Sequence, residues 1–442
     1  MLSYKKLGLN HVFFGWHVVG GAFIVAMFAF GIGFYGPPIF LETLHCIRGW
    51  SVSLISAAIT THFLFGALVT AKLATLHRRF GLSVVTSAGA VLTALGLLGW
   101  ALAQAPWQLF AVMPLSGAGW AMTGGAALNA MVSPWFVRRR PAALSMAYNG
   151  ASIGGMIFSP LWVALIAGVG FPWAACIVAA AAVVTLCLVA SRYLTRTPAN
   201  MGLLADGDIA DARTPIVRQG YAAAPLGRAW RDRRFITLTA VASLGLSAQV
   251  GLIAQLFSLL VPPLGEAGAG ATMGLATACA LGGRTILGLT MSPKADRRVI
   301  AAANVSLQLC GSVVLILAAG HSIPLLLLGC LLFGLGVGNT TSLPPLIAQA
   351  EFAAADVPRV VALVSALSQA SFTFAPAAFG ALRDLGQTLG LASHNGSAPL
   401  LFGAAALIQI AAASAAMLGP GATGRNQVKL SPPSNSSILP GR

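Results

Sequence analysis

Residues 268–291 read GAGATMGLATACALGGRTILGLTM, an apolar, glycine-rich run with a single charged residue, Arg284. A run of about 18 or more apolar residues is long enough to cross a bilayer as a helix. A charge at the centre of such a helix costs roughly 2.5–3.5 kcal/mol on insertion scales, so it usually persists because the protein uses it. This stretch predicts both a membrane span and a functional arginine.

The whole chain has the composition of a membrane protein. Of its 442 residues, 57% are hydrophobic and 8% are charged, and the mean hydropathy is +0.83. Soluble domains carry about 25% charged residues. The 50 glycines fit the same class, because small residues let membrane helices approach closely. The composition therefore predicts an all-α polytopic protein with the lipid bilayer as its surroundings.

The net charge of +16 would also suit a nucleic-acid-binding protein, so the placement of the basic residues decides between the two. Nearly all Lys and Arg fall in tails and loops that would share one side of the membrane, whereas Arg48 and Arg383 fall on the other side. This is the positive-inside pattern. It predicts a multi-pass protein of the cell (inner) membrane with both termini in the cytoplasm and no nucleic-acid partner.

Hydrophobic runs separated by Gly, Pro or charged residues predict twelve transmembrane helices. The expected spans are residues 14–38, 52–75, 83–103, 106–130, 141–167, 172–194, 235–262, 270–292, 299–319, 324–348, 358–383 and 397–418. A long polar segment separates the sixth span from the seventh. We therefore expect an N-terminal six-helix bundle over 1–195, a cytoplasmic linker over 196–234, a C-terminal six-helix bundle over 235–418 and a disordered cytoplasmic tail over 419–442.

The fifth and eleventh spans carry proline at corresponding places. The fifth opens at Pro141 and contains Pro160, and the eleventh opens at Pro358 and contains Pro376. A proline inside a span frees a backbone carbonyl, which neighbouring helices or water must satisfy. Interrupted helices at matching positions of two halves are typical of the central cavity of a transporter. Helix packing alone would explain them equally well.

Several motifs resemble the major facilitator superfamily. The six-plus-six plan and the basic loops after spans 2 and 4 resemble the superfamily as a whole. Three stretches resemble one branch more narrowly, that of the oxalate/formate antiporters and monocarboxylate carriers. They are Phe14-Gly15-Trp16, Gly49-Trp50-Ser51 and WFVRRR at 135–140. The resemblance implies the major facilitator fold, with two bundles rocking about a central cavity. It also implies secondary active transport of a small organic anion, such as a monocarboxylate, by proton symport or anion exchange.

The loop after span 2 departs from the superfamily pattern. Residues 76–81 read LHRRFG, with an Arg where the family usually has an Asp that ties the cytoplasmic ends of neighbouring helices together. The resemblance still implies that the basic loops on this side take part in gating. Their candidate residues are Arg78, Arg79, Arg138, Arg139 and Arg140.

Arg284 is the only cation that the predicted spans place well inside the membrane. It follows Leu281, the middle of its span, by about 4.5 Å at 1.5 Å per residue. Its planar guanidinium matches a carboxylate, and none of the ten Asp and Glu residues lies well inside a predicted span. An anionic substrate would therefore be its best counter-ion. The alternative is an arginine that extends to the interface.

The resemblance adds three points about this region. Residues 283–288, GRTILG, are similar to the family's arginine motif. Animal monocarboxylate carriers also have an Asp one turn earlier, where this chain has Ala280. The oxalate carrier has a Lys eight residues before a Pro in span 11, where this chain has Ser368. A single central cation favours a monoanion over oxalate.

Other polar side chains could line the cavity. His62 could couple transport to protons because histidine titrates near neutral pH, or it could simply bond to a neighbouring carbonyl. Tyr35 fits a gate or an interfacial aromatic belt. The remaining candidates could instead form interhelical hydrogen bonds; they are Asn129, Tyr148, Asn149, Gln249, Gln255, Ser368 and Gln369.

Two other functions were weighed against carboxylate transport. A superfamily efflux pump for drugs or secondary metabolites is the first, although the lack of cavity acids argues against cationic drugs. A membrane sensor or intramembrane enzyme is the second. No nucleophile elbow, phosphate-binding loop or metal-binding cluster is present, and the six cysteines have neither metal nor disulfide spacing. We therefore expect no enzymatic activity, no cofactor and no metal.

Overall fold

The computed structural model describes residues 13–207, 230–292, 295–353, 356–391 and 396–419. Within these ranges the chain is helical and contains no β-strand. Ten of its helices are long and apolar enough to cross a membrane. The predicted all-α polytopic membrane fold is confirmed. Most of the expected linker, and all but the first residue of the expected tail, lie outside the described residues.

In its described residues, the first half of the chain forms eight α-helices and two short 3-10 turns. They are α1 (Phe14–Gly33), α2 (Gly36–Arg48), α3 (Val52–Phe80), α4 (Leu82–Leu102), α5 (Pro106–Thr123), α6 (Gly125–Val132), α7 (Arg140–Val169), α8 (Phe171–Tyr193), η2 (Ala199–Met201) and η3 (Ala205–Gly207). Helices α1 and α2 form one span with a break, as do α5 and α6. These helices therefore make six passes.

The second half forms seven α-helices. They are α9 (Arg233–Thr290), α10 (Arg297–Ala318), α11 (Ile323–Thr340), α12 (Leu343–Glu351), α13 (Val357–Phe372), α14 (Ala375–Thr388) and α15 (Pro399–Met417). Helices α11 and α12 form one broken span, and α13 and α14 form another. Helix α9 supplies two passes, so this half also makes six.

The reversal inside α9 follows from its length and its contacts. A straight helix of its 58 residues would be about 87 Å long at 1.5 Å per residue. Arg298, which follows the end of α9, nevertheless donates a hydrogen bond of 3.0 Å to the carbonyl of Arg234 in its first turn. The chain turns back at Gly265, whose φ of 69° lies in the region that glycine adopts readily.

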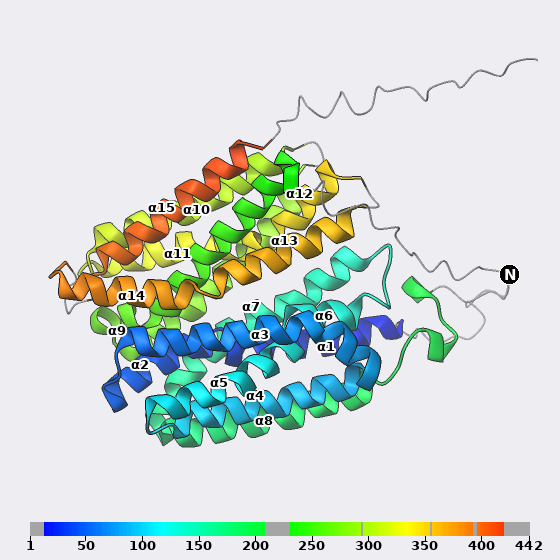
Figure 1. Ribbon diagram of the computed structural model, residues 1–442, viewed down its shortest axis with the longest axis horizontal. Helices are drawn as coiled ribbons and strands as arrows, with labels where there is room; N and C mark the ends of the chain where they lie inside the picture. Colours follow the sequence, from blue (N-terminus) through cyan, green and yellow to red (C-terminus); the bar gives the residue numbers. More distant parts are fainter. Residues whose placement is uncertain (1–12, 208–229, 293–294, 354–355, 392–395, 420–442) are drawn as a thin grey trace, which may run out of the picture.

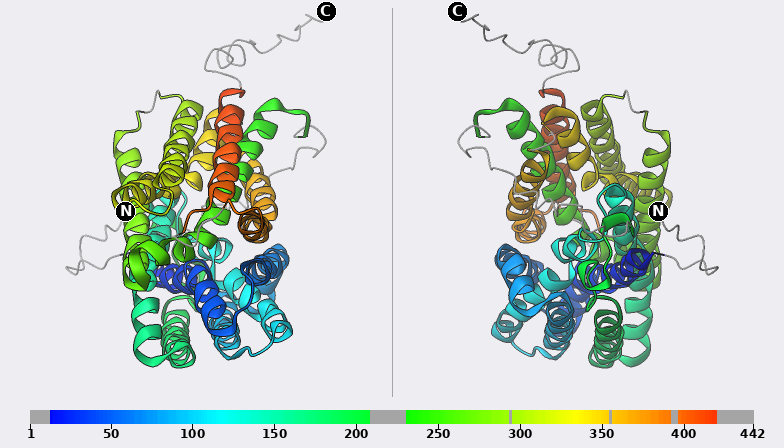
Figure 2. Two further views of the ribbon diagram at one scale, coloured as in Figure 1. Left: turned by 90° about the vertical axis from the view of Figure 1, so that its left-hand side faces the viewer. Right: turned by 90° about the vertical axis from the view of Figure 1, so that its right-hand side faces the viewer.

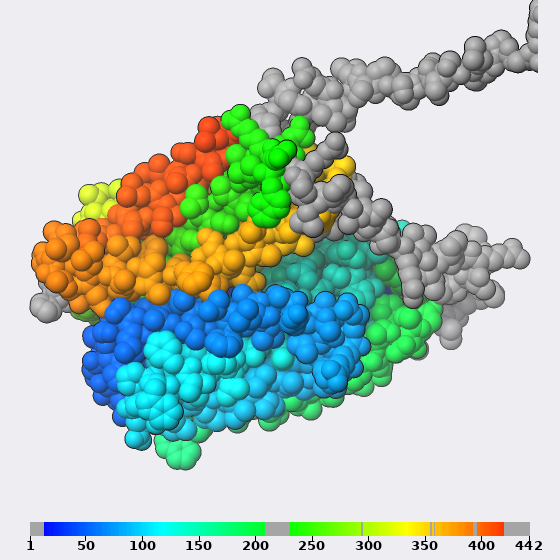
Figure 3. Space-filling model, viewed as in Figure 1, coloured from blue at the N-terminus to red at the C-terminus, as the bar shows by residue number. Residues whose placement is uncertain are grey.

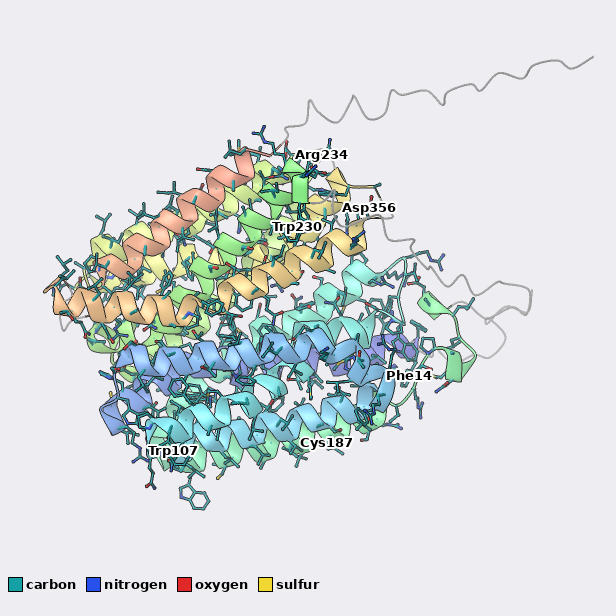
Figure 4. All side chains as sticks on the ribbon, in the orientation of Figure 1. Phe14, Trp107, Cys187, Trp230, Arg234 and Asp356 are labelled. Atoms are coloured by element: carbon teal, nitrogen blue, oxygen red, sulfur yellow. The ribbon has the colours of Figure 1, made fainter. Side chains whose placement is uncertain are left out.

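The helices gather in two groups, α1–α8 and α9–α15, which lie one above the other in Figure 1 and in the two end views of Figure 2. We call the end that carries residues 195–207 and the start of α9 the linker face, and the opposite end, with the turn at Gly265, the hairpin face. Phe14 and Arg234 lie towards the linker face and Trp107 at the hairpin face (Figure 4). Trp107 is 69% exposed, as expected in the interfacial belt of a membrane protein.

Four spans are broken at Pro or Gly. Pro37 lies in the first turn of α2, Pro344 in that of α12 and Pro376 in that of α14, while Gly124 separates α5 from α6. Proline is tolerated in the first turn of a helix, where the N–H has no intrahelical partner. The carbonyl one turn earlier loses its usual donor. Each break therefore creates backbone groups that need partners elsewhere.

The expectation that span 5 is interrupted is wrong. Helix α7 runs without a break through Pro160. Proline removes one hydrogen bond of the helix, and the carbonyl of Met156 is the group left without that donor. This carbonyl packs against Gly274 of α9, where an added Cβ would lie only 3.1 Å from the oxygen. Close packing of α9 supports α7 here, whereas span 11 is broken between α13 and α14.

The two groups are joined on the hairpin side of the molecule. Residues Ser56 and Phe63 of α3 are 0% and 3% exposed, and Phe63 packs edge-on against Phe372 of α13. Further along α3, towards the linker face, Ala71 and Ala74 are exposed. In Figure 3, α3 and the α13–α14 segment touch on the left and separate towards the right, where α7 is visible between them. The molecule is thus closed towards the hairpin face.

A buried ion pair joins three helices of the second group near the linker face. Arg298 Nε lies 2.6 Å from Glu351 Oε1, and the two side chains are 5% and 6% exposed. A second bond of 2.8 Å joins Arg298 Nη2 to Glu351 Oε2. Arg298 also donates to Thr237 Oγ1 at 2.9 Å. Helices α9, α10 and α12 are therefore held together through one guanidinium.

Replacing Glu351 with Gln should lower the stability of the protein by about 3 kcal/mol, because removal of one partner leaves a buried charge uncompensated. The measurement is the melting temperature of the purified protein in detergent. Asp356→Asn is the matched control, since Asp356 follows Glu351 closely and makes no side-chain cap bond. Equal melting temperatures for Glu351→Gln and the native protein would contradict this role.

Candidate functional site

Arg284 lies in the second pass of α9, where the two groups of helices meet. Its Nε donates a hydrogen bond of 3.0 Å to the carbonyl of Gly338 in α11. Its Nη1 donates one of 3.4 Å to Oδ1 of Asn149, in α7 of the other group. No Asp or Glu of the described residues pairs with this half-buried guanidinium. Neutral oxygens from both groups therefore hold the charge.

The carbonyl of Gly338 is available because α11 ends at Thr340, shortly before Pro344. Carbonyls in the last turn of a helix have no intrahelical donor, and this end carries a partial negative charge. Gly338 also lacks a side chain, and an added Cβ would lie 2.2 Å from the carbonyl oxygen of Ala280. Glycine thus allows the close approach that brings a helix end to the guanidinium of Arg284.

Two tyrosines of the first group face the same charge. Tyr35 and Tyr148 both interact electrostatically with Arg284. The Tyr148 hydroxyl donates to the carbonyl of Gly125 at 2.8 Å and accepts from Asn129 Nδ2 at 2.9 Å. Of the candidate residues, Asn149 bonds to Arg284 directly, Tyr35 and Tyr148 interact with its charge, and Asn129 is connected to it only through Tyr148.

His62 is enclosed by the first group of helices. Its side chain is 1% exposed, and its Nδ1 lies 2.9 Å from Ser116 Oγ in α5. Its ring packs against Phe63 and Trp120, with centroid separations of 5.0 and 6.3 Å. In this conformation His62 is a packing residue of the contact between α3 and α5.

The remaining polar candidates of the second group lie at different places. Gln255 donates to Ser56 Oγ at 2.8 Å and so joins the two groups on the hairpin side. Ser368 is 1% exposed and pairs with Ser243 inside the second group. Gln249 is 4% exposed, and its Oε1 has no hydrogen-bond partner in the described part of the chain. Gln369 is half-buried.

Arg383 was expected on the same side of the membrane as Arg48, at the end of the eleventh span. Helix α14 continues to Thr388, beyond the expected end of the eleventh span, so Arg383 lies within the helix. The guanidinium donates to Ser258 Oγ and, at 3.5 Å, to Gln255 Oε1 of α9. Near this end of the span, polar side chains of α9 accommodate the charge of Arg383.

The basic segment before α7 surrounds an acid that the sequence did not single out. The Asp206 carboxylate accepts backbone N–H bonds from Val137, Arg138 and Arg139, at 3.2, 2.8 and 3.3 Å. Burial alone would raise the pKa of Asp206. These N–H groups and the Arg138 guanidinium outweigh it and hold that pKa below its usual range. Asp206 thus fastens the start of the linker to the first group.

The other arginines of the two basic loops bond within their own segments. Arg140 donates to the carbonyls of Phe136 and Ser133, at 2.9 and 3.1 Å. Arg78 donates to Thr75 Oγ1 at 3.1 Å, and the Arg79 guanidinium lies 5.1 Å from the centre of the Phe80 ring. Their role in gating remains a prediction.

Replacing Asp206 with Ala should speed amide hydrogen exchange at residues 137–139, because three N–H groups lose their acceptor. Mass spectrometry of the exchanged protein measures this. Since the folded pKa is lowered, the ionised carboxylate contributes its full stability above the unfolded pKa of about 3.9. It loses that contribution as the pH falls through the pKa of Asp206 in the folded state. Protection of the amides of residues 137–139 from exchange should therefore not change around neutral pH. Unchanged exchange in Asp206→Ala would contradict the role of Asp206 as acceptor for these three N–H groups. Asp206→Asn should give an exchange rate between those of the native protein and Asp206→Ala.

Residues 18–376 match the family model of the Major Facilitator Superfamily. The chain belongs to this superfamily. With its apolar helices, this makes it a polytopic membrane protein. It is similar to a nucleoside transporter structure, with a TM-score of 0.65, 13% identity and coverage of 90% of this chain and 99% of the other. It is also similar to a bacterial homologue of the human lysosomal transporter Spinster, at TM-score 0.63, 13% identity, and 92% and 94% coverage.

Two curated relatives match part of the chain. Monocarboxylate transporter 13 of Bos taurus is 32% identical over 151 residues, which are 34% of this chain and 34% of the relative. MFS-type transporter 1 of Ophiocordyceps sp. (strain BCC 1869) is 31% identical over 169 residues, or 37% and 36% of the two chains. The chain thus spans about a third of the length of the curated relatives that it matches.

Proposed function

We propose that this protein is a secondary active transporter of a small organic anion, with a monocarboxylate as its substrate. The observation that carries the proposal is Arg284, a permanent charge between the two groups of helices that is bonded to neutral oxygens. A guanidinium forms its strongest paired hydrogen bonds with a carboxylate. A substrate carboxylate could replace the Asn149 oxygen, which is the longer of the two bonds, and neutralise the charge.

Alternating access would follow from rocking of two six-helix bundles, 1–195 and 235–418. The bonds that join the two groups at Ser56 and the Phe63 contact lie on the hairpin side of Arg284. Separation on that side and closure on the other would expose Arg284 to the opposite compartment. The positive-inside pattern assigns the linker face to the cytoplasm. The described conformation would then open towards the cytoplasm, and transport would proceed by proton symport or anion exchange.

The partial likeness to a monocarboxylate transporter supports this substrate class. The absence of a carboxylate partner for Arg284 among the described residues supports an anion over a cation. An efflux pump for anionic drugs or secondary metabolites would use the same charge. The size of the ligand that binds distinguishes the two functions.

Arg284→Gln should abolish carboxylate binding, because the amide keeps hydrogen bonds but removes the charge. The test is a thermal-shift series of the purified protein with formate, acetate, lactate, pyruvate, benzoate and oxalate, since a bound ligand raises apparent stability by mass action. A monocarboxylate should stabilise the native protein. Arg284→Lys should weaken binding about tenfold, because the charge remains but the planar fork is lost.

Arg192→Gln is the matched control, because Arg192 is exposed in the last turn of α8 and is not one of the gating candidates. It should leave the stabilisation by monocarboxylate unchanged. If Arg284→Gln were stabilised by the same ligand at the same concentration as the native protein, the proposed site would be wrong. Stabilisation by bulky amphipathic anions alone would favour the efflux function instead.

A further inference from the structure

Gln249, in the first pass of α9, is a buried side chain whose amide oxygen is not satisfied. The side chain is 4% exposed, and its Oε1 accepts no hydrogen bond from the described residues. Three other buried glutamines of the second group each bond to a side chain of a neighbouring helix; they are Gln255, Gln308 and Gln409. Nearly all buried polar groups of folded proteins have a partner. The free acceptor of Gln249 is therefore an exception that a bound ligand would explain.

The helix register places Gln249 against the end of α11. Four residues before it, Gly245 faces α11, since an added Cβ would lie 3.4 Å from Thr340 Cγ2. Four residues after it, Ile253 lines a cavity together with Val337 of α11. Residues four apart share one face of a helix. Gln249 therefore faces α11 between Val337 and Thr340.

The same part of α11 binds Arg284. Gly338, which lies between Val337 and Thr340, accepts the hydrogen bond of 3.0 Å from Arg284 Nε. Gln249 and Arg284 thus approach one helix end from the two passes of α9, the first with a neutral acceptor and the second with a permanent positive charge. A ligand with its carboxylate on the guanidinium would bring its adjoining atoms towards Gln249.

The cavity beside Ile253 is small and mostly apolar. Its volume is about 20 Å³, and its lining includes Met273 and Phe333. Tyr35 also lines it and interacts electrostatically with Arg284, which places the cavity next to the charge. A space of this size holds about one water-sized group. It therefore suits a methyl group close to a carboxylate, and it favours a short acid over a long one.

We propose that Gln249 selects a short monocarboxylate that carries a hydroxyl group next to its carboxylate. The proposal rests on the proposed function, because the carboxylate is bound by Arg284. The hydroxyl donates a hydrogen bond to Gln249 Oε1, and a methyl-sized chain occupies the cavity beside Tyr35. An acid without the hydroxyl leaves the Gln249 oxygen unpaired, and a site built to bond a hydroxyl disfavours such a ligand.

The test compares affinities within two pairs of acids that differ only by the hydroxyl group, namely lactate with propionate and glycolate with acetate. Isothermal titration calorimetry of the purified full-length protein in detergent gives each dissociation constant. In the native protein each hydroxy acid should bind about tenfold more tightly than its partner, because it gains one hydrogen bond to a buried acceptor. The ratio within a pair is measured on one variant, so both acids meet the same folded fraction.

Gln249→Met keeps the approximate shape of the side chain and removes its amide. The ratio should fall to about one in this variant, since the hydroxyl loses its acceptor and the plain acid no longer leaves one unpaired. Gln249→Leu, which differs in shape but also lacks the amide, should give the same ratio. The matched control is Gln409→Met, which removes the amide of a glutamine in α15 that is 1% exposed. This control should keep the native ratio.

The outcomes separate a ligand contact from a packing role. Loss of packing alone would weaken both acids of a pair alike, so an unchanged ratio in Gln249→Met would overturn the proposal. A native ratio near one would also overturn it, while carboxylate binding at Arg284 would still stand. If none of the four acids bound the native protein, the proposed function would fail, and the role of Gln249 with it.

Discussion

In the membrane interior every backbone N–H and carbonyl must find a partner within the protein. In this protein the groups that lack a partner within their own helix lie at the breaks of the broken spans. Each break exposes groups at a helix end that the helix cannot satisfy. The carbonyl of Gly338 accepts a hydrogen bond from Arg284, and the N–H of Ala377 donates one to Thr60 Oγ1. The candidate anion site and the closure on the hairpin side are therefore both built on helix ends.

Contacts of this kind suit a molecule that changes shape. A hydrogen bond between a side chain and a helix end adds about 1 kcal/mol net, so a few of them can hold one conformation without locking it. The Arg284 guanidinium is held by such a bond to Gly338 and by a side-chain bond to Asn149 across the two groups. The bonds that hold the Arg284 guanidinium and the bonds that join the two groups are therefore of similar strength. The buried pair of Arg298 and Glu351 is different, because it ties helices within one group.

The general plan could be predicted from the chain, because hydrophobic length and the placement of basic residues act one span at a time. Arg284 was recognisable for the same reason, as a charge within an apolar run. The break predicted at Pro160 was wrong, since packing of Gly274 supports a continuous helix there. The partners of Arg383 could not be predicted, because they come from another helix.

By itself, the sequence determined the membrane class, the twelve passes and the presence of a charge near the middle of the eighth. These follow from local composition and from the cost of placing polar groups in lipid. Only the tertiary structure decided which groups meet that charge, and that Asp206 and Asp384 each bind backbone N–H groups far away in the chain. Those partners depend on where helices end and how they pack, and residue type alone does not encode such distances.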